Sequence, residues 1–125
     1  RQRQMCIRDR YVRSGAQLLI IISNDAWWGD TEGHRQLLSY SRLRAIENRR
    51  AIARSANTGI SAFIDKNGEI LKKIDYNKKG VLVGNIQLEN RLTFYTKYGD
   101  YIARIALLFF ILTILFLFRN ILTKK

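Results

Sequence analysis

The residues best suited to chemistry lie in one short polar loop, Asn24–Gly29, which reads Asn-Asp-Ala-Trp-Trp-Gly. This loop directly follows an apolar run, Leu18–Ser23, and loops at strand ends carry many of the sites in α/β folds. Two Trp side chains in a polar loop are costly to expose unless they line a pocket or contact a membrane. An ordinary strand-to-helix turn, with Asp25 or Asp30 capping the next helix, explains the residues equally well. Residue chemistry alone leaves both interpretations open.

Two other residue types that often act in catalysis occur once each. Cys6 stands in an Arg-rich run that would favour its thiolate, but it has no His nearby and no strand before it. We therefore expect Cys6 to be incidental. His34 follows a Gly in a loop and is predicted to be solvated at the surface. One His and one distant Cys cannot form a metal site, and we expect no metal and no other cofactor.

Length and composition bound the class of protein. The 125 residues are 47% hydrophobic, which suits one domain, or a piece of a larger one, and argues against a disordered chain. The single Cys excludes an internal disulfide. The formal net charge of +12 is compatible with nucleic acid, anionic lipid or the flanks of a membrane segment. Positive charges concentrate at both chain ends. This distribution indicates that the C-terminal cluster, Arg119, Lys124 and Lys125, is the flank of a membrane segment.

Residues 101–119 are predicted to form a transmembrane helix. Ile102–Phe118 reads IARIALLFFILTILFLF, and Arg104 is its only charged residue. At about 1.5 Å per residue, the segment from Tyr101 to Phe118 is roughly 27 Å long, close to the hydrocarbon thickness of a bilayer. A soluble domain of this size could not cover such a helix on every face.

The flanking residues predict the orientation of this span. Arg119, Lys124 and Lys125 follow it, so the tail 120–125 is expected in the cytoplasm and the preceding domain on the outer side. Aromatic residues, which prefer the membrane interface, gather at the other boundary: Phe94, Tyr95, Tyr98 and Tyr101.

The region before the span reads as a layered α/β domain. The apolar patterns predict strands over Leu18–Ser23, Ala51–Ala56, Gly59–Ile64, Glu69–Ile74 and Gly80–Leu88. Asp65–Gly68 predicts a hairpin with a type I′ turn, because Asn-Gly readily supplies positive φ values. One helix over several strands would leave a face of the sheet uncovered, so the domain is expected to be incomplete or covered by a partner.

The one helix predicted in this domain is Arg35–Arg50. Its apolar stripe is formed by Leu37, Tyr40, Leu43 and Ile46. Arg44 and Glu47 stand three residues apart, where an ion pair is expected.

Four segments, in order and with sensible gaps, resemble apolipoprotein N-acyltransferases of the nitrilase, or carbon-nitrogen hydrolase, superfamily. They are Ser23–Asp30, Ser41–Glu47, Arg54–Ala62 and Thr93–Asp100. The Arg-Ala-Ile-Glu-Asn part, Arg44–Asn48, is widespread in the superfamily. The Asn24–Gly29 loop joined to a C-terminal membrane helix is much more specific.

This resemblance implies a partial nitrilase-like α/β sandwich over residues 11–92, a membrane-proximal linker over 93–100 and one transmembrane helix over 101–119. The family moves an acyl chain from a phospholipid to a catalytic Cys, as a thioester, and then to the diacylglyceryl-Cys of a lipoprotein. The expected partners are thus a phospholipid donor, a diacylglyceryl lipoprotein acceptor and the membrane, without nucleic acid. The expected location is the bacterial inner membrane, with a periplasmic domain.

The resemblance also assigns the site. Asn24, Asp25, Trp27 and Trp28 would line the acyl or substrate pocket, whereas Asn57, Thr58 and Gly59 would shape the sheet.

No catalytic residue can be assigned by the same resemblance. The family's Cys stands in a Cys-Tyr-Glu context, whereas Cys6 is followed by Ile7-Arg8. The base Glu and the Lys that stabilises the oxyanion would lie before Arg1. The chain is therefore expected to be an inactive C-terminal fragment, with residues 1–10 a non-native tail from an adapter or assembly artefact.

Two other functions are compatible with the sequence. The first is a nitrilase-fold amidase tethered by a membrane tail, although the Thr93–Asp100 segment argues against it. The second is a non-enzymatic, basic single-span protein that binds anionic lipid or nucleic acid through its Arg-rich tail in a salt-sensitive way. That function would leave the Asn24–Gly29 loop and the buried strand before it unexplained.

Overall fold

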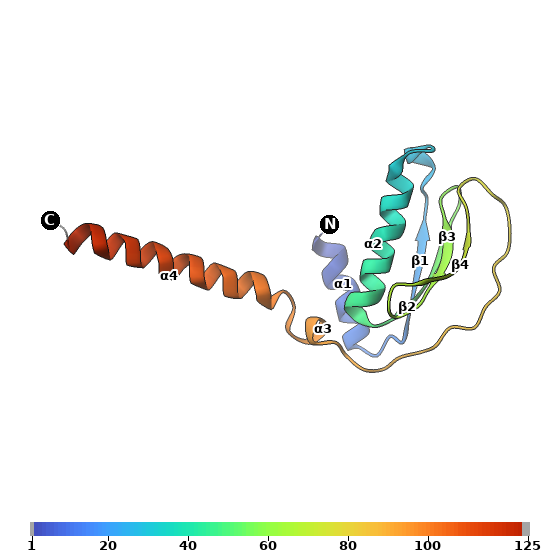
Figure 1. Cartoon of the computed structure of the whole chain (residues 1–125). Helices are drawn as coiled ribbons and strands as arrows, with labels where there is room; N and C mark the ends of the chain where they lie inside the picture. The colour runs from blue at the N-terminus through green and yellow to red at the C-terminus, as the bar shows by residue number, and fades with distance from the viewer. Residues whose placement is uncertain (1, 124–125) are drawn as a thin grey trace.

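A computed structural model describes residues 2–123, with side chains described for residues 7–119. The chain forms a helix-and-sheet domain from which one long helix projects (Figure 1). In chain order the elements are α1 Gln2–Arg13, β1 Leu18–Ser23, the 3-10 turn η1 Ala26–Trp28, α2 Glu32–Asn48, β2 Ala51–Ala56, β3 Ser61–Ile64, β4 Ile70–Ile74, α3 Phe94–Tyr98 and α4 Tyr101–Thr123.

The sheet has four strands in the order β1-β2-β3-β4. β1 and β2 are parallel, with Leu18 opposite Ala51 and Ser23 opposite Ala56, so the chain must cross back over one face through α2. The other two pairs are antiparallel. The predicted bounds of β1 and β2 are confirmed, and β3 and β4 are shorter than predicted.

The predicted hairpin joins β3 to β4, but the predicted type I′ turn is wrong. Gly68 has φ 83°, whereas Asn67 does not have positive φ. The Asp65 carboxylate accepts bonds from the backbone N–H groups of Asn67 (2.9 Å) and Glu69 (2.7 Å), which holds the turn in a wider form. A register shift between Phe63 and Ile64 accommodates the extra residue, as expected for a bulged hairpin.

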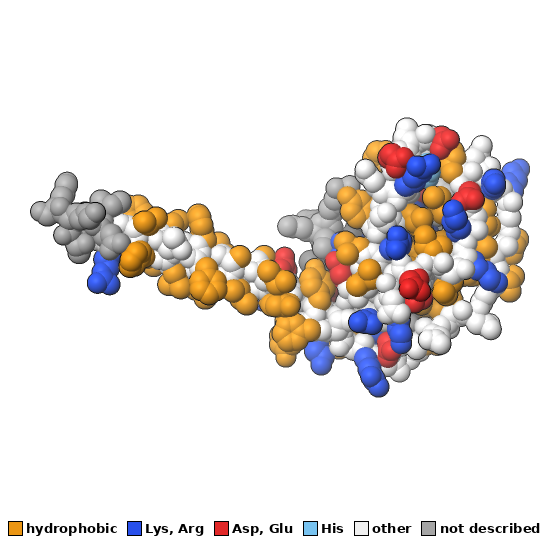
Figure 2. All heavy atoms as spheres, viewed as in Figure 1, with side chains coloured by type: hydrophobic (Ala, Val, Ile, Leu, Met, Phe, Trp, Pro, Cys, Tyr) orange, Lys and Arg blue, Asp and Glu red, His pale blue; other side chains and the backbone are white. Residues whose placement is uncertain are grey.

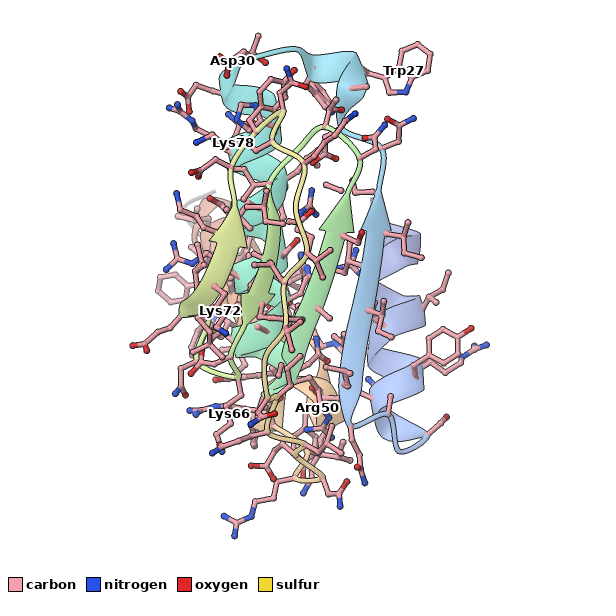
Figure 3. The ribbon with its side chains drawn as sticks, turned by 90° about the vertical axis from the view of Figure 1, so that its right-hand side faces the viewer. Trp27, Asp30, Arg50, Lys66, Lys72 and Lys78 are labelled. Atoms are coloured by element: carbon pink, nitrogen blue, oxygen red, sulfur yellow. The ribbon has the colours of Figure 1, made fainter. Side chains whose placement is uncertain are left out.

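The two faces of the sheet are covered unequally. α1 and α2 lie on one face, and the extended segment 75–93 runs along the other (Figures 1 and 3). The predicted strand Gly80–Leu88 is wrong. This stretch runs across the face of the sheet, where no strand lies beside it to form backbone hydrogen bonds with it. On this face the side chains of Ile20 and Ile22 are 70% and 86% exposed, in line with the expected uncovered face.

The face of α2 that packs on the sheet is not the predicted apolar stripe. Its buried residues are His34, Leu38, Ser41, Ala45 and Asn48. Three of the four residues predicted for the stripe, Tyr40, Leu43 and Ile46, are half-exposed. Small and polar residues form the contact between α2 and the sheet, because α2 lies close to β2 and accommodates the charged side chain of Arg54 from that strand.

α4 extends away from the domain, with apolar side chains on its visible surface (Figures 1 and 2). Its segment Tyr101–Arg119 has 19 residues and a mean hydropathy of 2.5, and none of its most apolar stretch is buried against the rest of the molecule. A core helix would be buried, so α4 is a candidate membrane span, as predicted. Lys124 and Lys125, which contribute to the predicted orientation, lie outside the described residues.

Candidate functional site

The Asn24–Gly29 loop follows the C-terminal end of β1 and leads through η1 into α2 (Figure 3). Neither Asp25 nor Asp30 caps α2. The N-cap is Thr31, whose hydroxyl accepts a bond from the Gly33 backbone N–H (3.3 Å). The capping role considered for Asp25 and Asp30 is therefore wrong, although the loop does connect a strand to a helix, as the alternative interpretation held.

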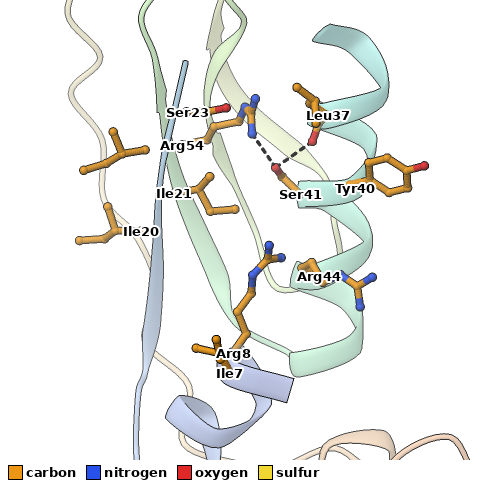
Figure 4. A pocket seen from close by; sticks show the side chains of 11 residues that line it. Ile7, Arg8, Ile20, Ile21, Ser23, Leu37, Tyr40, Ser41, Arg44 and Arg54 are labelled. Carbon is orange, nitrogen blue, oxygen red and sulfur yellow. Dashed lines mark hydrogen bonds between the residues drawn. The ribbon is translucent and has the colours of Figure 1, made fainter. Parts of the chain in front are cut away.

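Asp25 is fully buried and pairs with a charge from the neighbouring strand. Arg54 Nη2 on β2 lies 2.6 Å from Asp25 Oδ2, and the Ser23 hydroxyl bonds the other carboxylate oxygen. Arg54 Nη1 also donates to Ser41 Oγ (3.0 Å, Figure 4), and its Nε donates to the Ile60 carbonyl (3.2 Å). Such a pair is tolerated inside a protein only when the hydrogen-bonding groups of both partners are satisfied, as these contacts achieve.

Two residues expected to shape the sheet instead support this loop. Asn57 Oδ1 accepts bonds from the backbone N–H groups of Asp25 (3.2 Å) and Thr58 (2.8 Å). Gly59 packs directly against Asp25, because a Cβ at position 59 would lie 2.7 Å from the Asp25 Cβ. The backbone of the loop is therefore fixed at several points.

The remaining predicted site residues face outward. Trp27 is 88% exposed and projects from the end of the domain (Figure 3). Trp28 is 51% exposed, with its indole over Gly33 at the start of α2. Asn24 is exposed, and its Oδ1 accepts a bond from the Ala26 backbone N–H (3.3 Å). The loop thus divides into a buried Asp25 and three outward-facing neighbours.

A cavity of about 560 Å³ lies between β1, α1 and α2 (Figure 4). Its lining combines apolar side chains with two Ser hydroxyls and three guanidinium groups: Ile7, Arg8, Ile20, Ile21, Ile22, Ser23, Leu37, Tyr40, Ser41, Arg44 and Arg54. None of the four predicted pocket residues lines it. The pocket assigned to Asn24, Asp25, Trp27 and Trp28 stays a prediction.

The prediction that His34 is solvated is wrong. His34 is 2% exposed and its ring stacks on Tyr76, with ring centroids 4.5 Å apart. It lies on the buried face of α2, and the start of segment 75–93 covers it. Its Nδ1 has no hydrogen-bond partner among the described residues. The Cys6 side chain lies outside the described part of the chain.

The predicted ion pair between Arg44 and Glu47 is confirmed. Burial raises the pKa of Glu47 above its usual value, although the Arg44 guanidinium favours the ionised carboxylate. The pair is thus a partly buried structural contact on α2.

Sequence reasoning missed the partner of Asp25. The signal was present: Arg54 is the one charged residue in the strand Ala-Ile-Ala-Arg-Ser-Ala, which is otherwise small or apolar. A buried Arg needs an acidic partner, and Asp25 follows the adjacent parallel strand at the same end of the sheet.

Comparison with known proteins gives two findings. The family model described as carbon-nitrogen hydrolase matches residues 6–92. The chain is also similar to curated apolipoprotein N-acyltransferases: 42% identical to that of Chlorobaculum tepidum over 97 residues, 42% to that of Geobacter metallireducens over 93, and 39% to that of Rickettsia bellii over 111. These matches cover 78%, 74% and 88% of this chain, which spans only 18%, 18% and 21% of the respective relatives.

Proposed function

The chain belongs to the carbon-nitrogen hydrolase family, and on that premise we propose that it is part of an apolipoprotein N-acyltransferase. Such an enzyme transfers an acyl chain from a phospholipid, through a Cys thioester, to the N-terminal diacylglyceryl-Cys of a lipoprotein. The observation that carries the proposal is the Asn24–Gly29 loop. Its backbone is fixed by a buried ion pair, yet its two indoles face outward on a domain joined to a candidate membrane span.

In this proposal the chain contributes a wall of the acyl pocket. A Trp side chain offers 150–250 Å² of apolar surface at low conformational cost, so Trp27 and Trp28 suit contact with an acyl chain. The buried Asp25 sets where these indoles stand, and the exposed Asn24 amide offers polar contacts to a headgroup or peptide. The nucleophilic Cys, the base Glu and the Lys would lie outside residues 1–125.

The proposed location is the bacterial inner membrane, with the domain in the periplasm. Arg119, Lys124 and Lys125 follow the candidate span, whereas Lys97 is the one cation in residues 93–100 before it, and this excess of cations favours a cytoplasmic C-terminus. A membrane enzyme so oriented would find both of its proposed substrates, phospholipid and lipoprotein, at the same surface.

A chimera tests the proposal. Residues 11–125 replace the matching C-terminal segment of the Geobacter metallireducens relative, and the purified chimera in phospholipid vesicles receives a diacylglyceryl lipopeptide. We expect mass spectrometry to detect a third acyl chain on the lipopeptide. The parent enzyme and the parent truncated at the junction are the positive and negative controls. A chimera that inserts and folds like the parent but leaves the lipopeptide diacylated contradicts the proposal.

A further inference from the structure

The short helix α3 is hydrogen-bonded to the C-terminal end of α2. The Thr93 hydroxyl donates to the Glu47 carbonyl (2.6 Å) and caps α3 by accepting a bond from the Thr96 backbone N–H (3.0 Å). The Thr96 hydroxyl lies 3.2 Å from Asn48 Oδ1, and both side chains are fully buried. We name these four residues, Glu47, Asn48, Thr93 and Thr96, the clasp.

Two Arg side chains reinforce the clasp from neighbouring elements. Arg13, at the end of α1, donates from Nε to the Thr96 carbonyl (2.7 Å). Arg50 is buried just after α2 and donates from Nη1 to the Arg91 carbonyl (2.9 Å). Three regions that are distant in sequence therefore meet at α3.

α3 is also tied to the candidate span that follows it. The Phe94 ring packs on Tyr98 within α3 and on Tyr101 at the start of α4, with ring centroids 4.5 and 4.9 Å apart. The Gly99 backbone N–H donates to the Tyr95 carbonyl (2.7 Å), and the connection to α4 is only two residues long, Gly99 and Asp100. Motion of α4 relative to α3 is therefore limited by both the short connection and the aromatic contact.

α2 connects the clasp to the candidate site. Its 17 residues extend about 25 Å, with the clasp at the C-terminal end and the Asn24–Gly29 loop at the N-terminal end (Figure 1). At the loop end the Thr31 hydroxyl donates to the Trp28 carbonyl (2.6 Å). The span, α3, α2 and the loop thus form one continuous series of contacts.

We propose that the clasp holds the domain in a fixed position relative to the membrane, which makes Asn48, Thr93 and Thr96 positioning residues for the loop. The functional consequence rests on the proposed function: a loop that receives an acyl chain from a bilayer must stay at a set position relative to it. Residues 93–100, expected to be a linker, would then be a rigid joint. Without the clasp, α3 and α4 would move together relative to the domain, and the extended segment 75–93 before α3 would act as the pivot.

The test measures a distance and needs no acyl transfer, so failure of the clasp and failure of the proposed function are distinguishable. Spin labels are attached at Ser39→Cys on α2 and Leu108→Cys on α4, in the full chain with Cys6→Ser, in phospholipid nanodiscs. Pulsed electron resonance then gives the distribution of label-to-label distances. The test variant is Thr96→Val, which keeps the shape of the side chain and leaves Asn48 Oδ1 without its donor.

We expect a narrow distribution in the parent and a broad one in Thr96→Val, because loss of a buried donor lowers the docked-to-undocked ratio roughly tenfold. Thr96→Ser keeps the hydroxyl and should restore the narrow distribution. Thr113→Val, the same change at a hydroxyl that bonds only within α4, should leave the distribution narrow. An unchanged distribution in Thr96→Val overturns the proposal. Loss of the thermal unfolding transition of the domain in that variant would also overturn it, by assigning Thr96 to the stability of the domain itself.

Discussion

The two ends of α2 are held by different chemistry. At the loop end a fully buried charge pair, Asp25 with Arg54, fixes the backbone. At the clasp end no charge pair is buried: hydroxyls, a side-chain amide and backbone carbonyls make the contacts, and the Arg13 and Arg50 guanidinium groups donate to backbone carbonyls. A buried charge that loses its partner is costly, whereas a neutral hydrogen bond contributes only modestly to stability. The strongest of these interactions thus fixes the loop that presents Trp27 and Trp28, whereas weaker bonds hold the membrane-proximal helix α3.

The largest expected effect comes from Asp25→Asn, which leaves the Arg54 guanidinium buried without a counter-charge. We expect it to lower the free energy of unfolding by about 3–5 kcal/mol. Urea denaturation in detergent micelles measures the change. Asp30→Asn, which alters an exposed carboxylate of the same polar segment, is the matched control. Equal stability of the two variants would show that the ion pair does not hold the loop.

Gly59→Ala should come next, since the added Cβ would press against Asp25. Overpacking of this kind costs about 1–3 kcal/mol. Because both changes act on the same ion pair, the double variant with Asp25→Asn should lose less stability than the sum of the single variants. Strict additivity would mean that Gly59 acts elsewhere.

Thr93→Ala probes the clasp end and should cost about 1 kcal/mol, the usual cost of losing a helix N-cap. The same denaturation experiment measures it, with Thr113→Ala as the control. A loss as large as that of Asp25→Asn would erase the difference between the two ends of α2.

The smallest expected effect is a pH dependence of the free energy of unfolding that arises from Glu89, near the clasp end. The backbone N–H groups of Arg91 and Asn90 and the Lys66 ammonium lower the pKa of Glu89 from 4.5 to about 2. The folded state therefore keeps this carboxylate ionised when the unfolded chain already binds a proton. Its contribution to stability is present above pH 4.5 and is lost as the pH falls towards 2. Glu89→Gln should flatten the stability curve in that window, and parallel curves would contradict this assignment.

Sequence patterns predicted what local composition determines. The apolar runs gave the bounds of β1 and β2, and the long apolar stretch gave the candidate span. Contacts between distant segments were not predictable in the same way. His34 is buried because Tyr76 covers it, and α2 packs through Ser41 and Ala45 because a helix close to β2 needs small residues there. The Asp25–Arg54 pair required knowledge that β1 and β2 are parallel neighbours.

The most direct test of the account is acyl transfer by the chimera carrying Trp27→Ala. Trp27 is almost fully exposed in this chain, so its loss should change the free energy of unfolding by no more than about 0.5 kcal/mol. If the indole lines the acyl pocket, transfer to the lipopeptide should fall about tenfold or more, as expected for losing a large apolar contact. Normal folding with impaired transfer is the predicted result. Normal folding with full transfer would contradict the pocket role of the loop.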